Sequence, residues 1–257
     1  MKINVRTVLR LVLPAAVIAA LIGGWQVAAS TGRLAEELGL EPFLVPSPAE
    51  VGDALWNSRS LLWENTWVTL REIVLGIAFG TLAGLALAVA MRFSRILRDA
   101  VYPLAVASQA IPIVVIAPIL VIWFNYGIWP KVIVVAFGVF FPITVTTLDG
   151  LRSVDPEAVK MMRTLDASRW GIFRRVEAPT ALPYIFTGAK VAVAIAPIVA
   201  LFAELAGANS GLMLLITQAN NNFREDLVFA AATVLAVIGV LLVGLTALAQ
   251  RLVVTWR

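Results

Sequence analysis

The sequence contains no cysteine and no histidine among its 257 residues. Without cysteine there is no disulfide framework and no thiolate nucleophile or metal ligand. Without histidine the chain also lacks the usual proton shuttle and the commonest metal ligand in proteins. We therefore expect no metal site, no catalytic residue and no enzyme activity of its own in this chain.

Charged residues are also scarce, because Asp, Glu, Lys and Arg make up 14% of the chain while 60% is hydrophobic and the mean hydropathy is +0.91. A soluble core cannot hold that much apolar surface, so the composition predicts an integral membrane protein in contact with lipid. The net charge is +4. In a membrane protein basic residues collect in cytoplasmic loops, and we expect no nucleic-acid partner.

Long apolar runs are plentiful. A spanning helix needs about 20 apolar residues. The runs predict an all-α polytopic membrane protein whose single transmembrane domain covers residues 1–257. Six spans are expected at about 8–29, 66–91, 100–124, 130–149, 183–205 and 227–250. The fifth includes Lys190, whose stem can snorkel to the nearer interface, and ends near Glu204.

Basic residues predict the orientation, since Lys and Arg near span ends favour the cytoplasmic side. Fourteen of them fall on one side of the six spans, including both chain ends, the loop with Arg92 and Arg95, and the loop with Arg163 and Arg169. Both termini are therefore expected in the cytoplasm. Alternatively, the first apolar run is a cleaved signal peptide, because it ends in a small-residue Val27-Ala28-Ala29 sequence.

Two spans have unusual composition. The uncharged run from Ala100 to Trp129 is longer than one span needs and holds Pro103, Pro112 and Pro118. Proline removes backbone hydrogen bonds, so at membrane depth such a segment is expected inside protein or along a cavity, unless it is only a kinked helix. In the second span Gly76, Gly80 and Gly84 recur every four residues and predict a smooth face for another helix, within the subunit or at a subunit interface.

A basic segment with clear helix start and stop signals interrupts the apolar chain between the fourth and fifth spans. Asp155-Pro156-Glu157 is a typical helix start, and the helix is expected to run to about Leu165. Asp166 and Ser168 are two possible caps for a second short helix, which Ala178-Pro179 is expected to end. The pair suits insertion into a groove of another protein, and the alternative is a solvated loop on lipid headgroups.

The segment VDPEAVKMMRTLDASRWGIFRRVEAPTALP resembles the cytoplasmic coupling segment, here residues 153–180, of permease subunits of ATP-binding-cassette importers. The resemblance extends along nearly the whole chain. It includes Leu44-Val45-Pro46-Ser47-Pro48, Thr69-Leu70-Arg71, Ile111-Pro112, Ala203-Glu204 and Gly211-Leu212. The branch it resembles is the nitrate, sulfonate and taurine branch, and the proline-rich third span is similar to members associated with thiamine pyrimidine precursors.

The resemblance implies the type I importer permease fold with cytoplasmic coupling helices. It implies a homodimer in the bacterial cytoplasmic (inner) membrane, two copies of a cytoplasmic ATPase and an extracytoplasmic substrate-binding protein. No P-loop GxxxxGK[ST] occurs in the chain, so ATP with Mg²⁺ is expected on the ATPase and no cofactor on this chain. The expected ATPase contacts are Arg163, Thr164, Leu165, Asp166, Ala167, Ser168 and Arg169.

The sequence departs from the family pattern at four places, the first of which is Lys160-Met161-Met162, where the family has a glutamate and two alanines. Asp166 stands where the family has a turn glycine, Asn125 where glycine is common, and Met213 where the family has the second glycine of GLG. Glycine at a turn suggests a left-handed backbone, which Asp adopts at a cost of about 1 kcal/mol. Asp166 is expected to offset part of this cost by capping the second short helix.

The expected translocation-pathway residues combine amide groups and flat aromatic faces: Gln109, Trp123, Phe124, Asn125, Tyr126 and Glu204. They suit an uncharged heteroaromatic solute, most of all a thiamine pyrimidine precursor, although interface aromatics occur in any membrane protein. Pairing of Glu204 with Arg71 is the structural alternative to a contact with substrate. Sulfonate, taurine or nitrate remains the alternative substrate class.

Two other functions fit less well. An intramembrane protease needs a Ser–His pair, a zinc-binding HExxH or a GxGD, and none is present. A self-sufficient secondary carrier should keep its coupling groups in its own spans, where Glu204 is the plausible acidic residue. The two transport classes differ in one observable property, because a carrier works alone and an importer permease needs its ATPase.

Overall fold

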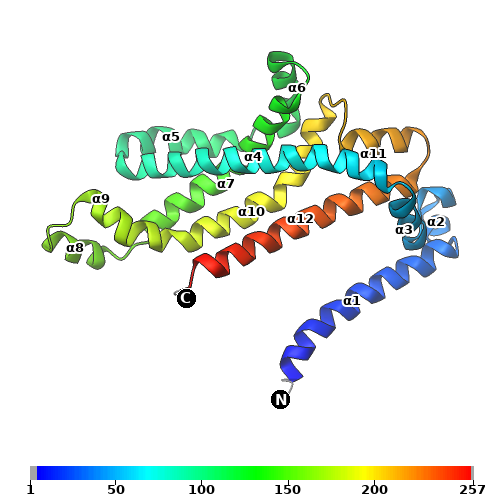
Figure 1. Cartoon of the computed structure of the whole chain (residues 1–257), viewed down its shortest axis with the longest axis horizontal. Coiled ribbons are helices and arrows are strands. Elements are labelled where there is room, and N and C mark those ends of the chain that lie inside the picture. Colours follow the sequence, from blue (N-terminus) through cyan, green and yellow to red (C-terminus); the bar gives the residue numbers. More distant parts are fainter. Residues whose placement is uncertain (1–4, 256–257) are drawn as a thin grey trace. The chain divides into compact units, whose positions relative to one another are not determined.

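The computed structural model describes residues 5–255, and over that range it is helical with no strand. The α-helices are α1 (Val5–Ser30), α2 (Arg33–Leu38), α3 (Pro48–Asn57), α4 (Arg59–Phe93), α5 (Arg95–Ser108), α6 (Ile113–Phe124), α7 (Ile128–Arg152), α8 (Pro156–Thr164), α9 (Arg169–Ile172), α10 (Ala178–Leu205), α11 (Leu212–Asn221) and α12 (Glu225–Val253). Between them lie a 3₁₀ turn, η1 (Pro42–Leu44), and a π-helical turn, η2 (Phe173–Glu177). The helices form two compact units, residues 5–64 with 215–234 and residues 65–214 with 235–255 (Figure 1).

Four described helices are long and apolar enough to cross a membrane: α4, α7, the continuous helix Arg169–Leu205, and α12. The pair α5 and α6 meets the same test together and is either a fifth, broken span or a re-entrant loop, while the described apolar part of α1, Ala16–Ser30, is shorter. The prediction of an all-α polytopic membrane protein is confirmed. The count of six spans stays a prediction.

The third predicted span, residues 100–124, is not one straight helix. It is broken between Ser108 and Ile113, and its two halves bend by 101°. Pro112 lies in the break and has no backbone N–H to continue the ladder of hydrogen bonds from α5. The break therefore has a local cause, although Pro103 and Pro118 lie within helices without ending them.

The glycines of α4 allow α7 to approach its backbone closely. A Cβ atom at Gly76 would overlap the Val135 side chain, and one at Gly80 would lie 2.5 Å from the Ala136 carbonyl oxygen. A Cβ atom at Gly84 would lie 2.8 Å from the Phe140 carbonyl oxygen. The predicted smooth face is confirmed, and the partner helix belongs to the same subunit.

The core of the larger unit lies where α10 packs along α7 (Figure 1). Alanines on α10 that recur about once per turn are buried, at Ala192, Ala196, Ala200 and Ala203. Such small side chains let two helices approach, and dispersion contacts then replace the missing hydrophobic drive of a lipid environment. The packing of α10 along α7 helps to position the polar site described below.

The second short helix of the basic segment does not end at Ala178-Pro179, contrary to the prediction. After α9 the chain passes through η2 directly into α10, so Arg169–Leu205 is one continuous helix. Pro179 is tolerated because it lies in the first turn of α10, and the π turn before it already departs from i→i−4 bonding. The helix that contains the predicted fifth span, 183–205, therefore begins well before that span, whose bounds stay a prediction.

The smaller unit contains the LVPSP motif that precedes α3. Ser47 is the N-cap of α3, Pro48 is its first residue, and Ser47 and Glu50 form a capping box. The Ala49 amide also donates to the Gln26 side chain of α1 at 2.9 Å. The motif therefore determines how α3 starts and ties it to α1.

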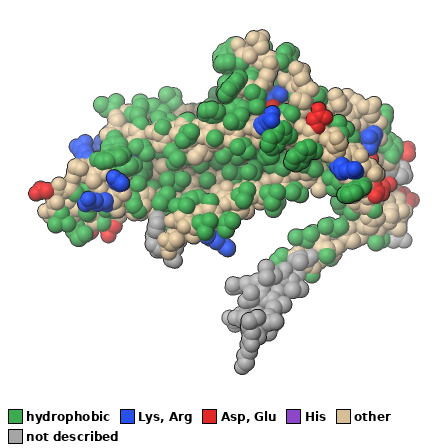
Figure 2. Space-filling view, viewed as in Figure 1, with side chains coloured by type: hydrophobic (Ala, Val, Ile, Leu, Met, Phe, Trp, Pro, Cys, Tyr) green, Lys and Arg blue, Asp and Glu red, His purple; other side chains and the backbone are tan. Residues whose placement is uncertain are grey.

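Figure 2 shows hydrophobic side chains over most of the visible face of the larger unit, while Lys, Arg, Asp and Glu gather around α8 and α9. Exposed large hydrophobic residues include Leu82, Ile96, Leu104, Ile122 and Leu252. A lipid-facing surface is expected to have this composition. The charged side chains around α8 and α9 indicate that this part of the larger unit lies in water rather than in lipid.

Candidate functional site

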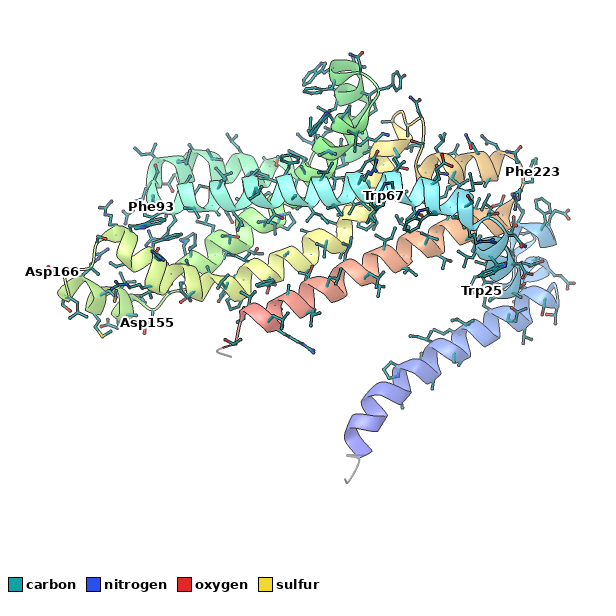
Figure 3. All side chains as sticks on the ribbon, in the orientation of Figure 1. Trp25, Trp67, Phe93, Asp155, Asp166 and Phe223 are labelled. Atoms are coloured by element: carbon teal, nitrogen blue, oxygen red, sulfur yellow. The ribbon has the colours of Figure 1, made fainter. Side chains whose placement is uncertain are left out.

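The coupling segment, residues 153–180, begins as the sequence predicts. The Asp155 side chain accepts the Glu157 amide at 2.9 Å, and Pro156 is the first residue of α8. The helix ends with Thr164, and Leu165 is its C-cap. Figure 3 labels Asp155 and Asp166 at the two ends of this helix. Local signals in the sequence are sufficient to specify α8.

Asp166 has the left-handed backbone that the family glycine suggests, with φ of 56°. The Ala167 amide donates to the Met162 carbonyl at 3.0 Å, which closes the turn after α8. The cap of α9, however, is Ser168, whose hydroxyl accepts the Gly171 amide at 3.1 Å. The expectation that Asp166 caps the second helix is wrong, because Asp166 lies two residues before the N-cap position.

Six of the seven predicted ATPase contacts are exposed, and Ala167 is half-buried. Leu165 leaves 70% of its surface open although it is a large apolar residue. Behind the segment, Trp170 and Phe173 stack with ring centroids 5.1 Å apart, and Phe93 at the end of α4 lies 5.3 Å from Phe173. An aromatic cluster thus supports an otherwise exposed helical pair.

A basic cavity of about 320 Å³ lies beside the coupling segment and is lined by Arg92, Arg95, Arg163 and Arg169 together with Glu177. Arg92 pairs with Glu177, which is 3% exposed. The other three arginines make no ion pair with any residue that the structure describes. Their charges are therefore available to an anionic partner.

The predicted pathway residues do not form one site. Gln109 is the C-cap of α5 and lines a second cavity of about 430 Å³. The others, apart from Glu204, are exposed where α6 ends: Trp123, Phe124, Asn125 and Tyr126. Asn125 has φ of 62°, a left-handed backbone that glycine adopts without strain. The Tyr126 ring lies against Gly207, where a Cβ atom would come within 2.8 Å of it.

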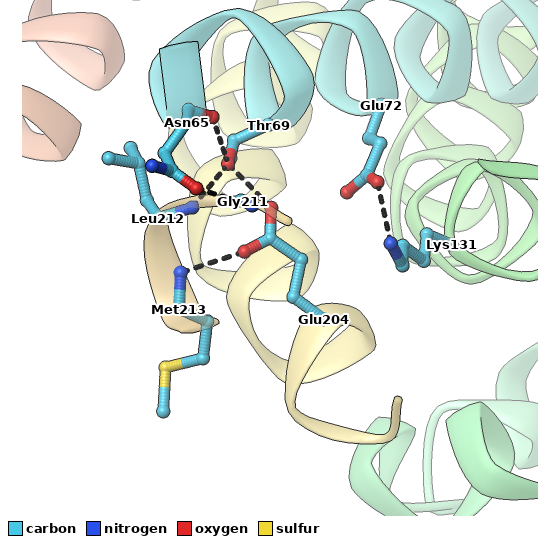
Figure 4. Close-up of polar contacts among 8 residues, drawn as sticks. All are labelled: Asn65, Thr69, Glu72, Lys131, Glu204, Gly211, Leu212 and Met213. Carbon is cyan, nitrogen blue, oxygen red and sulfur yellow. Dashed lines mark hydrogen bonds and ion pairs between the residues drawn. The ribbon is translucent and has the colours of Figure 1, made fainter. Parts of the chain in front are cut away.

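Glu204 is 2% exposed and belongs to a polar network inside the larger unit (Figure 4). Its carboxylate accepts the Thr69 hydroxyl at 2.5 Å and the Met213 amide at 2.7 Å. The Thr69 oxygen accepts the Leu212 amide at 2.9 Å, and Asn65 accepts the Gly211 amide at 2.9 Å. The start of α11 is thereby tied to α4 and α10.

A buried ion pair lies next to this network. The Lys131 ammonium group is 3.1 Å from the Glu72 carboxylate, and the two side chains are 6% and 1% exposed. The Glu204 carboxylate is close enough to repel the Glu72 carboxylate. Figure 4 shows Glu72 on α4 and Lys131 on α7 beside the Glu204 contacts. We call Glu72, Lys131 and Glu204 the buried charge cluster.

Pairing of Glu204 with Arg71 is wrong, because Arg71 is exposed and lies over the Trp67 ring at 4.8 Å from its centroid. The sequence reasoning also missed Glu72 and Lys131. A signal was present, since both residues border predicted spans at the same predicted end of the bundle as Glu204. Opposite charges at that end indicate a possible pair.

The network unites motifs that are far apart in the sequence: Thr69-Leu70-Arg71, Ala203-Glu204 and Gly211-Leu212. Gly211 has φ of 126°, and a Cβ atom there would lie 2.5 Å from the Glu204 carboxylate. Only glycine meets both conditions without strain. These motifs therefore build the interior of the subunit, and the coupling segment is the part that presents charge outward.

The fold places the chain in the class of type I importer permeases. A solved structure of the methionine ABC transporter MetNI in an inward-facing conformation contains a chain that matches with a TM-score of 0.68 at 18% identity, covering 77% of this chain and 98% of that one. The chain belongs to the family of binding-protein-dependent transport system inner membrane components, whose pattern it matches over residues 76–255.

Relatives in sequence support the same family. The formylaminopyrimidine transport permease ThiX of Halalkalibacterium halodurans is 37% identical, covering 84% of this chain and 87% of the relative. The riboflavin permease RibX of Chloroflexus aurantiacus is 36% identical, covering 85% and 82%. The taurine permease TauC of Escherichia coli is 29% identical, covering 83% and 80%. The chain is thus an ABC importer permease of the nitrate, sulfonate and taurine branch.

Proposed function

We propose that this permease subunit is driven by a separate cytoplasmic ATPase that binds the coupling segment. The observation that carries the proposal is the exposure of Arg163, Leu165 and Arg169 on a pair of short helices. Guanidinium groups without an intramolecular partner suit carboxylates of another protein, and an exposed leucine suits an apolar pocket. Met161 is also 61% exposed and widens this apolar contact.

The proposed assembly is a homodimer of this chain with two ATPase subunits and an extracytoplasmic binding protein, in the bacterial inner membrane with both termini in the cytoplasm. ATP and Mg²⁺ belong to the ATPase, and this chain binds no cofactor. The continuous helix Arg169–Leu205 supports a mechanism, because movement of α9 by the closing ATPases would reach the membrane interior along one unbroken helix. The subunits would then expose the pathway to each side in turn.

The proposed substrate is an uncharged heteroaromatic compound such as a thiamine pyrimidine precursor. Relatives named for formylaminopyrimidine and riboflavin transport support this class, since both are flat nitrogen heterocycles. A sulfonate, taurine or nitrate substrate is the second candidate, and the taurine permease among the relatives favours it. A self-sufficient carrier is not favoured in a chain of this family.

The test is co-purification with the ATPase encoded in the same operon. The double variant Arg163→Glu and Arg169→Glu should insert normally and lose the ATPase, because repulsion replaces attraction at both arginines. The matched control is Arg174→Glu and Arg175→Glu, which makes the same change in net charge at two exposed residues of η2. The control should retain a stoichiometric ATPase.

Equal retention by both double variants would overturn the assignment of the contact to residues 163–169. Uptake by this chain alone in ATP-free liposomes would overturn ATP coupling itself and restore the carrier. The two failures are distinguishable, because the first leaves uptake dependent on the ATPase and the second does not.

A further inference from the structure

The break between α5 and α6 is the least regular part of the predicted membrane-spanning region. Over residues 109–112 the chain leaves the helix, and the next helix starts at an angle of 101° to the previous one. In the part of the chain that the structure describes, the Gln109 and Ala110 carbonyls accept no backbone hydrogen bond. Non-helical backbone at membrane depth is tolerated only inside protein or beside a cavity.

A cavity of about 430 Å³ lies at this break. One wall is the break itself with Gln109, another is α7 with Phe137 and Phe141, and a third is α10 with Val199 and Phe202. The volume falls within the range of about 300–1,000 Å³ that is typical of small-molecule sites. The discontinuous helix and the cavity are separate observations that coincide at Gln109.

The lining has a specific chemistry. It contains three phenylalanine rings and no Asp, Glu, Lys or Arg. The Gln109 side chain is exposed and has an amide that both donates and accepts hydrogen bonds. Gly138 also lines the cavity, and its carbonyl lacks the usual helical donor because the residue four positions later is Pro142. Flat apolar walls thus stand beside a few hydrogen-bonding groups.

We propose that this cavity is an intramembrane binding site for one flat, uncharged heteroaromatic ring, with the Gln109 amide reading the hydrogen-bonding edge of the ring. The site deepens the proposed function and rests on it. Phenylalanine rings offer stacking and edge contacts to such a solute. A sulfonate or nitrate ion would find no countercharge in the lining, and an unpaired ion in an apolar site is strongly disfavoured.

A second copy of the chain is the competing occupant of the cavity. An apolar helix from a partner subunit would cover the phenylalanines and would also bury the Gln109 amide without a hydrogen bond, which is costly. A nitrogen heterocycle satisfies the same amide. The side-chain chemistry of the lining therefore favours a solute over a packed helix.

The experiment uses the complete importer in proteoliposomes: this chain, its ATPase and its binding protein. The probes are labelled formylaminopyrimidine and labelled taurine. Gln109→Leu keeps the side-chain size but removes the amide, and it should lower kcat/KM for formylaminopyrimidine uptake about tenfold, the size expected for one lost hydrogen bond. The matched control Gln218→Leu changes an exposed glutamine of α11 outside the cavity and should stay within about twofold.

Three results would overturn the proposal. The first is equal formylaminopyrimidine uptake by wild type and Gln109→Leu, and the second is wild-type uptake of taurine without formylaminopyrimidine. The third is a Gln109→Leu chain that forms a tighter oligomer than wild type, because a partner helix in the cavity would no longer bury an unpaired amide, and this result would assign the cavity to a second copy. In each case, co-purification of the ATPase with the wild-type chain shows separately whether the proposed ATP-coupled function holds.

Discussion

Two regions of the larger unit are rich in charged residues, and they differ in whether these residues are buried and paired within the chain. In the buried charge cluster Glu72, Lys131 and Glu204 are almost fully buried, and every one has a partner within the chain. In the coupling segment Arg163 and Arg169 are exposed and have no ion-pair partner among the described residues. Buried charge must keep its partner for the subunit to stay stable, whereas exposed charge without a partner is available to another protein.

The comparison predicts that loss of a cation is severe in the buried charge cluster. Lys131→Met removes the only basic residue that pairs with Glu72 in the described structure and leaves a buried carboxylate uncompensated. Breaking a buried pair in this way costs about 3–5 kcal/mol. We expect a large fall in the thermal unfolding midpoint of the purified subunit in detergent.

Two further variants sharpen this result. Lys131→Met combined with Glu72→Leu should recover most of the stability, because an apolar pair of similar volume replaces the ion pair. Arg71→Met, at a neighbouring exposed position over Trp67, should cost about 1 kcal/mol or less. If Lys131→Met and Arg71→Met unfold at the same temperature, the cluster does not stabilise the subunit.

Gly211→Ala should have the next largest effect. The new Cβ atom would collide with the Glu204 carboxylate, and alanine is strained at φ of 126°. Together these terms amount to about 2–3 kcal/mol. The matched control is Gly244→Ala, where nothing lies within 4 Å, and where alanine should raise helix stability slightly. Unfolding midpoints that move in the same direction for both variants would contradict the close contact.

Two threonine-to-valine variants, Thr69→Val and Thr164→Val, compare the loss of a hydroxyl group in the two regions. The Thr69 hydroxyl donates to Glu204 and accepts from Leu212, so its loss leaves two buried groups unpaired and should cost about 1.5 kcal/mol. In the coupling segment the Thr164 hydroxyl donates only to the Met161 carbonyl. Thr164→Val should therefore change the unfolding free energy by less than about 0.5 kcal/mol. A chemical-denaturation series on both variants measures the difference, and equal losses would refute it.

The two regions also differ in how far the sequence alone predicts them. The helix start at Asp155-Pro156 is a local feature and was predicted from adjacent residues. The left-handed position of Asp166 was predicted from the turn glycine that the resembled family has there. The cap at Ser168 was one of two open choices that differ by two residues. Composition likewise predicted the apolar helices, since span length depends only on consecutive residues.

The buried charge cluster was not predicted because its members come from α4, α7 and α10, and no local rule determines which helix faces which. The Glu204–Arg71 pairing was wrong for this reason, since Arg71 and Glu72 are adjacent and point in different directions. The proline-rich third span was predicted to be irregular. Pro112 is a local cause of the break, but the angle of 101° between the two helices depends on tertiary packing. Long-range partners are therefore the main part of this fold that a single sequence does not specify.

The smallest effect is expected at Asp166, where a strained backbone lies in the exposed region. Asp166→Ala keeps φ near 56° with a residue that visits the left-handed region less readily, at an added cost of about 1 kcal/mol. The loss is local, so the amides that close the turn, of Asp166 and Ala167, should exchange with deuterium about fivefold faster while the global unfolding midpoint stays unchanged. Asp166→Gly should not accelerate exchange in this way, because glycine adopts the turn without strain. If alanine and glycine accelerate exchange equally, the aspartate side chain stabilises the turn, and the backbone strain that the family glycine suggests is not the controlling factor.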